Sequence, residues 1–400
     1  MILPGVASGP LRGAYEVVVV GAGVAGLTVA YELAKAGVGP VAVLERAYPG
    51  AGASGRNGEL IRSAFASSEW CGLFDESLRR WHGLSAELDF NVMFAPRGYA
   101  VVASTEEQLQ RCRADVQRQK ALGVESRFVD QDELRRIAPA LNPEHALGGT
   151  YQATAGYAHH DAVVWAYTRA AARLGVEIHA GVTVTGVVVT GGKVRGVRTD
   201  KGDVATTVVV NAAGAHAGRL AELAGVRLPV KICRLEALVT ESAQPFLRPS
   251  LGLLEPIGYC HQTARGEFIG GAEQSWHDEA VTLNGTFRQL VDMATKFVRM
   301  LPVLAGLRVV RHWAGVVSQT PDFAPLLGPV PEVEGFVLNC GHVYGFMASP
   351  AAGTCVAHFV RDGHMAAIGA PFDVGRFLAG RPIREDSIVV GMDSGPGGAA

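Results

Sequence analysis

Residues 15–46, YEVVVVGAGVAGLTVAYELAKAGVGPVAVLER, decide the fold. The run at 16–20 is mostly valine, which is typical of a parallel strand buried on both faces. Apolar residues then recur at helical spacing until Gly37, which is well placed to end a helix. A second apolar run, at 41–44, ends at Glu45. The order strand, tight turn, helix, strand predicts a parallel βαβ unit.

The turn between this strand and helix has the pattern GxGxxG, which is typical of a dinucleotide-binding site. The first glycine permits a sharp turn, the second lets the backbone approach a pyrophosphate, and the third lets helix and strand pack closely. The helix N-terminus adds free N–H groups and the positive end of a dipole. Glu45 has about the spacing expected for the acid that binds ribose hydroxyls, and Arg46 follows it as a further candidate contact. The other expected contacts are Gly21, Gly23, Val24, Ala25 and Gly26.

A second polar, glycine-rich loop, SGRNG at 54–58, follows the second strand. Such a loop could run along a ligand longer than a mononucleotide, which favours FAD over a nicotinamide cofactor. From the residues alone, an NAD(P)-dependent dehydrogenase with the same first turn remains an alternative. The candidate contacts in this loop are Ser54, Gly55, Arg56, Asn57 and Gly58.

Another glycine-rich turn lies near the end of the chain, in NCGHVYGFMASPAAG at residues 339–353. It follows a strand-like apolar run and leads into small residues that could open a helix. On the residues alone two interpretations are equally open. The turn either packs the last helix onto the sheet or contacts the far end of the cofactor.

Together these motifs resemble those of the D-amino-acid oxidase superfamily of FAD-dependent amine oxidoreductases. The pattern is most similar to the branch of glycine oxidase, the sarcosine oxidases, and the β subunits of multisubunit sarcosine oxidase and proline dehydrogenase. The resemblance spans residues 15–373. It implies an α/β fold (α+β overall), with a Rossmann-like FAD-binding domain and a discontinuous antiparallel-sheet substrate domain.

The resemblance also implies a domain division. We expect the FAD-binding domain to comprise residues 14–90, 145–226 and 305–375. Residues 91–144 and 227–304 would form the substrate domain. Residues 376–400 would be a C-terminal tail, with the final SGPGGAA disordered.

Further contacts to FAD follow from the resemblance. The residues NAAG at 211–214 would close over the cofactor from the other side. The helix after the C-terminal turn would point its N-terminus at the flavin ring, where it stabilises negative charge on the reduced ring. The expected contacts are Val182, Ala212, Ala213, Gly214, Trp313, Gly315, Gly341, His342, Gly345, Phe346 and Met347.

The implied reaction is oxidation of the C–N bond of a small amino acid or secondary amine, of the glycine, sarcosine or proline type. A hydride passes to flavin N5, water hydrolyses the resulting imine, and the electrons go on to O2 or another acceptor. The protein must orient the substrate, and an arginine is suited to clamp a carboxylate in bidentate fashion. Arg62 matches such an arginine in the sarcosine oxidase branch. The candidate catalytic residues are Arg62, Tyr259, His261, His312 and His342.

Three positions depart from the pattern of that branch. Met347 stands where monomeric sarcosine oxidases have a lysine that helps to hold the substrate carboxylate. Gly315 stands where they attach FAD to a cysteine, so we expect FAD to be bound non-covalently. Phe268 lies near the expected position of a basic residue that promotes reaction with oxygen, which leaves the electron acceptor open.

The sequence AHHDAVVW at residues 158–165 allows two interpretations. In β subunits of heterotetrameric sarcosine oxidase, a histidine before an aspartate carries a covalent FMN at a subunit interface, and His160 before Asp161 resembles it. The interpretation that we favour is that Asp161 caps a helix and His160 lies on the surface. A flavin-bearing β-type subunit of a multisubunit amine dehydrogenase or oxidase is therefore the alternative to a free-standing enzyme, either monomeric or oligomeric.

Composition and charge exclude other classes of function. The formal net charge is −2 and no basic run stands out, so a nucleic-acid partner is not expected. The six cysteines form no CxxC pair, and no metal site is expected. The N-terminus lacks the regions of a secretory signal, and the apolar run at 17–20 is too short to span a membrane. We expect a cytoplasmic protein whose partners are a small amine or amino-acid substrate and an electron acceptor.

Overall fold

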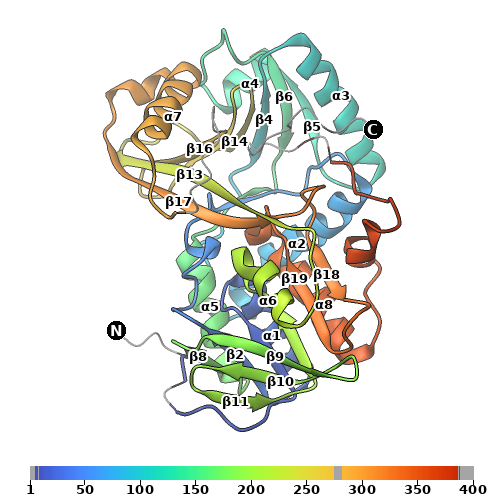
Figure 1. Ribbon diagram of the computed structural model, residues 1–400. Helices are drawn as coiled ribbons and strands as arrows, with labels where there is room; N and C mark the ends of the chain where they lie inside the picture. Colours follow the sequence, from blue (N-terminus) through green and yellow to red (C-terminus); the bar gives the residue numbers. More distant parts are fainter. Residues whose placement is uncertain (1–4, 8, 274–281, 386, 388–400) are drawn as a thin grey trace.

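The computed structural model describes residues 5–7, 9–273, 282–385 and 387 (Figure 1). Its described helices are α1 (Val24–Lys35), α2 (Ser68–Glu87), α3 (Glu106–Ala121), α4 (Gln131–Ile137), α5 (His160–Arg173), α6 (Ala217–Leu223), α7 (Phe287–Met300) and α8 (Gly345–Asp362). Among the described residues, no helix combines the length and the apolar character that crossing a membrane requires.

A six-stranded sheet forms the centre of the lower part of Figure 1. In spatial order its strands are β18 (Leu326–Pro329), β19 (Phe336–Cys340), β12 (Val208–Asn211), β1 (Val17–Val20), β2 (Val41–Glu45) and β8 (Glu177–Ala180). All its pairings are parallel except that of β18 with β19. The unit β1–α1–β2 confirms the predicted strand, turn, helix and strand, and all four valines of β1 are buried.

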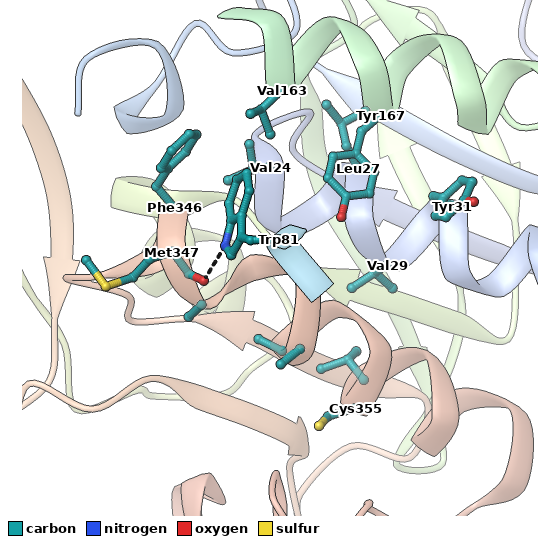
Figure 2. Close-up of a cluster of buried hydrophobic side chains, with 14 of the residues drawn as sticks. Val24, Leu27, Val29, Tyr31, Trp81, Val163, Tyr167, Phe346, Met347 and Cys355 are labelled. Carbon is teal, nitrogen blue, oxygen red and sulfur yellow. Dashed lines mark hydrogen bonds between the residues drawn. The ribbon is translucent and has the colours of Figure 1, made fainter. Parts of the chain in front are cut away.

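Helices and a small sheet cover the two faces of the six-stranded sheet. On one face α1 packs against α5 and α8, and Figure 2 shows Leu27 and Tyr31 of α1 with Tyr167 of α5 and Trp81 of α2 in one apolar cluster. The other face packs against α6 and a three-stranded sheet. That sheet consists of β11 (Gly202–Ala205), β10 (Lys193–Thr199) and β9 (Val184–Thr190). A sheet covered on both faces explains the continuous valine runs of its strands.

An eight-stranded sheet forms the upper part of Figure 1. Its order is β17 (Val309–Gln319), β13 (Lys231–Ser242), β16 (Glu267–Ala272), β15 (Ile257–Gln262), β14 (Ser250–Leu254), β4 (Tyr99–Ala103), β6 (Gly148–Gln152) and β5 (Arg127–Asp130). It is antiparallel except for the pairing of β14 with β4. Phe268 lies in its core, edge-on to Phe297 of α7. A separate pair, β3 (Leu60–Ile61) and β7 (Gly156–Tyr157), completes the described strands.

Two segments lie in a different sheet from the one expected. Residues in 145–226 and 305–375 were expected in the FAD-binding domain, but β6 and β17 pair within the eight-stranded sheet. β17 pairs with β13 along almost its whole length, and the two antiparallel strands extend between the upper and lower parts of Figure 1. Pairing partners distant in sequence decide this membership, so the local pattern of β17 could not show it.

The segment after residue 375 is not simply a tail, because some of its described residues are buried. Arg376 is buried and pairs with Asp322 through its Nε and Nη2 atoms, at 2.8 and 2.9 Å. Ile383 and Glu385 are also buried. The final SGPGGAA lies outside the described residues.

Candidate active site

A cavity of about 620 Å³ lies where the six-stranded and eight-stranded sheets meet. Its walls include the turns after β1, β12 and β19, which are carboxyl ends of parallel strands, and residues from β13, β15 and β17. Ligands of open α/β sheets bind at that edge. The expected residues that line the cavity are Gly21, Gly23, Val24, Ala25, Glu45, Arg46, Ser54, Arg56, Asn57, Gly58, Arg62, Ala212, Ala213, Gly214, Tyr259, Gly315, Gly341, His342, Gly345, Phe346 and Met347.

The first glycine turn has the close backbone approaches that its sequence predicts. Gly21 has a φ of +110°, and a Cβ there would overlap the carbonyl oxygen of Ala212. A Cβ at Gly26 would overlap the carbonyl oxygen of Gly21, so Gly26 serves the packing of helix on strand and does not line the cavity. The Val24 N–H donates to Ser54 Oγ at 3.0 Å, which ties the second loop to the start of α1.

Glu45 is fixed at the end of β2 by two backbone donors. Its Oε2 accepts from the Ala22 N–H at 3.0 Å and its Oε1 from the Ala47 N–H at 2.8 Å. The carboxylate therefore stands beside the glycine turn, as expected for an acid that binds ribose hydroxyls.

A second cavity of about 280 Å³ adjoins the first and shares Gly21, Glu45, Arg46, Ala213 and His216 with it. Val182 lines only this smaller cavity. Arg46 Nη2 lies 2.7 Å from His216 Nε2, and burial followed by the charge of Arg46 lowers the pKa of His216. Two joined cavities with the α1 N-terminus at one wall fit an elongated dinucleotide such as FAD. The sequence analysis did not identify His216.

The C-terminal turn follows β19 and lines the same cavity. Gly341 has a φ of +70°, and its N–H donates to Ser318 Oγ at 3.1 Å. α8 begins at Gly345, and its first residues line the cavity. The Met347 carbonyl accepts from Trp81 Nε1 at 3.0 Å and from Ser77 of α2, which fixes this end of α8 (Figure 2). The N-terminus of this long helix thus borders the cavity, and α8 packs against α1.

His342 is held in one tautomer. Asn339 Nδ2 donates to the Ala25 carbonyl at 2.9 Å, so Asn339 Oδ1 must accept the proton of His342 Nε2 at 2.8 Å. His342 Nδ1 is therefore left as an acceptor. Burial lowers the pKa of His342 to about 4, so the ring is neutral at pH 7. The sequence analysis did not assign a role to Asn339.

Arg62 is a buried cation in the cavity wall, with 1% of its surface exposed. Its Nη1 donates to the Ala64 carbonyl at 2.6 Å and its Nη2 to the Ser387 carbonyl at 3.0 Å. The guanidinium also lies 3.9 Å from the ring centre of Phe65 and 5.3 Å from that of Tyr99. Among the described residues it has no carboxylate partner, and a guanidinium has five N–H donors.

Tyr259 reaches the cavity from β15. Its ring occupies the space that a side chain at position 58 would need, so Gly58 permits the contact between loop and sheet. Burial raises the pKa of Tyr259 to about 12, which keeps the phenol neutral.

Besides Gly26, four expected residues line neither cavity. His261 is buried against Tyr157, with ring centres 4.4 Å apart. His312 Nε2 lies 2.7 Å from the buried carboxylate of Glu236. Trp313 donates from Nε1 to the Arg56 carbonyl at 3.1 Å and so supports the loop from behind. A Cβ at the fourth, Gly55, would come within 2.6 Å of the Gly50 carbonyl oxygen, so this residue serves a tight turn.

Glu59 is a cavity residue that the sequence analysis passed over. It is 3% exposed, its Oε1 lies 2.6 Å from His160 Nδ1, and its Oε2 lies 3.4 Å from His261 Nε2. Burial disfavours the charged carboxylate, but the two histidines outweigh burial and lower the pKa of Glu59. Glu59 in turn outweighs the burial of His160 and raises the pKa of that imidazole.

The expected helix cap near His160 is wrong. α5 begins at His160 with His159 at the cap position, so Asp161 lies in the first turn. His160 is not a plain surface residue, because it is bound to Glu59. Donor atoms of Glu59, His159 and His160 lie within 4.8 Å of one another, a spacing that could hold a metal ion where none was expected.

The comparisons with known proteins agree with this geometry. Residues 16–359 match the family described as FAD dependent oxidoreductase (DAO). The chain is 34% identical to sarcosine oxidase subunit beta of Arthrobacter sp., with 93% of each chain covered. It is 33% identical to sarcosine oxidase subunit beta of Rhodobacter capsulatus, with 94% of this chain and 92% of the relative covered. The solved structure of L-proline dehydrogenase from P. horikoshii is similar with a TM-score of 0.89 and 27% identity, covering 93% of this chain and 100% of that one.

Proposed function

Because the chain belongs to the DAO family of FAD-dependent oxidoreductases, we propose that it oxidises the C–N bond of a small amino acid or secondary amine that bears a carboxylate. The names of its relatives support this substrate class, since they include sarcosine oxidase subunits and an L-proline dehydrogenase. Glycine, sarcosine and proline-like compounds are the substrates that we put forward.

The observation that carries the proposal is the buried guanidinium of Arg62. A buried cation is costly unless a charge or several hydrogen bonds stabilise it. Arg62 lies in the cavity wall with two carbonyl acceptors and free N–H groups. A substrate carboxylate in the cavity would supply the missing negative charge, in the bidentate geometry that arginine favours.

The protein would hold FAD along the two joined cavities. The first turn of α1 with Gly23 would bind the phosphates, Glu45 the ribose, and the C-terminal turn at Gly341 the flavin ring. Gly315 offers no side chain for a covalent bond, which supports non-covalent binding. The bound cofactor would supply a two-electron acceptor for the hydride of the substrate.

The remaining cavity residues would orient the substrate and keep it unprotonated. Neutral His342 presents Nδ1 as an acceptor, and neutral Tyr259 adds no charge to compete with the carboxylate. The apolar side chains of Phe346 and Met347 line the same cavity and exclude water from it. An amine placed here would lose hydride only as the free base, and the nearby cation of Arg62 favours that form.

The test is anaerobic mixing of the purified yellow protein with pairs of amines that differ only in the carboxylate. Sarcosine and N-methylethylamine form one pair. We expect sarcosine to bleach the flavin absorbance near 450 nm and N-methylethylamine to bleach it poorly. Equal bleaching by both would contradict the carboxylate requirement, and a colourless protein that binds only a nicotinamide would contradict the whole proposal. Repeating the assay with O2 and with an artificial acceptor identifies the oxidant.

A second candidate is a flavin-bearing β-type subunit of a multisubunit amine oxidoreductase. Two observations favour it: the relatives named as beta subunits, and His160 bound to Glu59 at the border of the cavity. In that case His160 would carry a second flavin, FMN, and the chain would need partner subunits. The mass of the denatured protein tests for a covalent flavin, and activity of the isolated chain with an artificial acceptor tests the need for partners.

A further inference from the structure

The last described residues of the chain are anchored at three points, one of which is the cavity residue Arg62. We call residues Ile383, Glu385 and Ser387 the strap. Its first anchor is the Ile383 N–H, which donates to Asp322 Oδ2 at 2.9 Å. Asp322 is itself held by Arg376, so the strap begins at a fixed point just after β17.

Glu385 is the second anchor and occupies the N-terminus of α2. Its carboxylate accepts from the Ala66 N–H at 2.9 Å and from the Ser67 N–H and Oγ, both at 2.8 Å. The side chain is only 9% exposed. A carboxylate at this end of a long helix also benefits from the helix dipole.

Ser387 is the third anchor and contacts Arg62. Its N–H donates to Glu385 Oε1 at 2.9 Å, and its hydroxyl donates to the same atom. Its carbonyl accepts from Arg62 Nη2 at 3.0 Å. Glu385 therefore fixes the position of Ser387, and Ser387 fixes one edge of the guanidinium.

We propose that the strap is a positioning element of the substrate site, in which Glu385 acts through Ser387 to hold Arg62 ready for a carboxylate. This inference rests on the proposed function. Arginine has a long, flexible side chain. Hydrogen bonds to the Ala64 and Ser387 carbonyls hold the guanidinium of Arg62 in one orientation. Loss of the hydrogen bond to Ser387 would let the guanidinium rotate. The substrate carboxylate would then have to order the guanidinium again on binding.

The test compares Glu385→Gln with Glu69→Gln in the flavin-loaded protein. Both changes remove an acid at the N-terminus of α2, but only Glu385 contacts Ser387. Acetate is the probe, with acetamide as the neutral comparator. The readouts are flavin absorbance, the acetate-induced rise in Tm, and kcat and KM for sarcosine.

We expect Glu385→Gln to weaken acetate binding about tenfold, the cost of ordering one long side chain again on binding. KM for sarcosine should rise with kcat nearly unchanged, because a ground-state contact is lost. Glu69→Gln should change neither value, and Glu385→Asp should restore part of the affinity. If Glu385→Gln does not fold, Ser387→Pro removes the N–H bond to Glu385 and leaves the α2 contacts in place.

Two outcomes overturn the inference. Equal effects of Glu385→Gln and Glu69→Gln would reduce Glu385 to a helix-stabilising role, and tighter acetate binding by Glu385→Gln would make the strap a competitor of the substrate. Arg62→Gln separates this inference from the proposed function. If Arg62→Gln leaves acetate binding unchanged, the carboxylate proposal fails. If only Arg62→Gln weakens binding, the strap inference alone fails.

Discussion

At the scale of single residues, Arg62 gives the sharpest prediction. We expect Arg62→Lys to lower kcat/KM for sarcosine roughly 10- to 100-fold, because a lysine cannot reproduce two parallel charged hydrogen bonds. The loss should be mostly in KM. Steady-state kinetics with the chosen acceptor measures it, and N-methylethylamine is the control, since its slow oxidation should not change. A parallel loss for both amines would mean that the substitution disturbs the flavin rather than the carboxylate.

His342 gives a prediction for the dependence of stability on pH. Burial lowers the pKa of His342 to about 4, whereas an unfolded histidine has a pKa of about 6.5. Between these values the unfolded chain binds a proton that the folded chain does not, so acidification in this window destabilises the folded protein. Urea unfolding of the apoprotein at pH 7 and pH 5 measures this effect. Between these pH values the free energy of unfolding should fall less in His342→Gln than in the unsubstituted protein. An identical loss would mean that His342 is not desolvated.

At this scale, residues that act through the backbone were easier to predict from the sequence than residues that act through their side chains. Glycine at positions 21, 26 and 341 could be interpreted locally, because turns and close approaches restrict those positions to glycine. Asn339 and Glu59 act through partners more than a hundred residues away in the chain. No spacing in the sequence predicts such a contact. His312 was expected in the pocket but lies against Glu236, which is also distant in the chain.

At the scale of elements, the junction of β1 and α1 depends on the glycine at position 26. We expect Gly26→Ala to lower Tm and the fraction of bound FAD, because the new Cβ would overlap the Gly21 carbonyl and push α1 away from the strand. Gly72→Ala is the matched control, since Gly72 is also helical and nothing lies within 4 Å of its Cβ position. Gly72→Ala should leave the free energy of unfolding unchanged or raise it by up to about 1 kcal/mol through helix propensity. Thermal unfolding and the ratio of flavin to protein absorbance measure both variants.

The elements that the sequence predicted well are those that local periodicity determines. β1, α1 and β2 follow from a valine run, a helical repeat and a glycine turn. The long pair β13 and β17 was divided between two expected domains, because their register is set by each other and not by their own residues. The start of α5 was misplaced for a similar reason: His160 N–H is satisfied by Glu59, so a local cap is not needed.

At the scale of the whole molecule, the ion pair of Arg376 with Asp322 joins the end of the chain to the segment after β17. Arg376 also donates to the carbonyls of Phe372, Asp373 and Ala324. We expect Arg376→Met to lower the free energy of unfolding by about 3–5 kcal/mol, because it leaves a buried carboxylate unpaired. Urea denaturation measures this.

The exposed Arg384 provides the control for that experiment. Arg384→Met should change stability by less than about 0.5 kcal/mol. A small effect of both substitutions would contradict the view that the ion pair holds the end of the chain in place. This contact was not predicted, since residues 376–400 were expected to be a tail.

The close packing of Tyr259 on Gly58 restricts how these two positions can evolve. The aromatic ring fills the volume in which any side chain at position 58 would have to lie. A side chain at position 58 therefore requires a smaller residue at position 259. In descendants or relatives that carry a side chain at position 58, we expect a smaller residue at the place of the tyrosine, and a library that randomises both sites should recover functional clones in that paired combination.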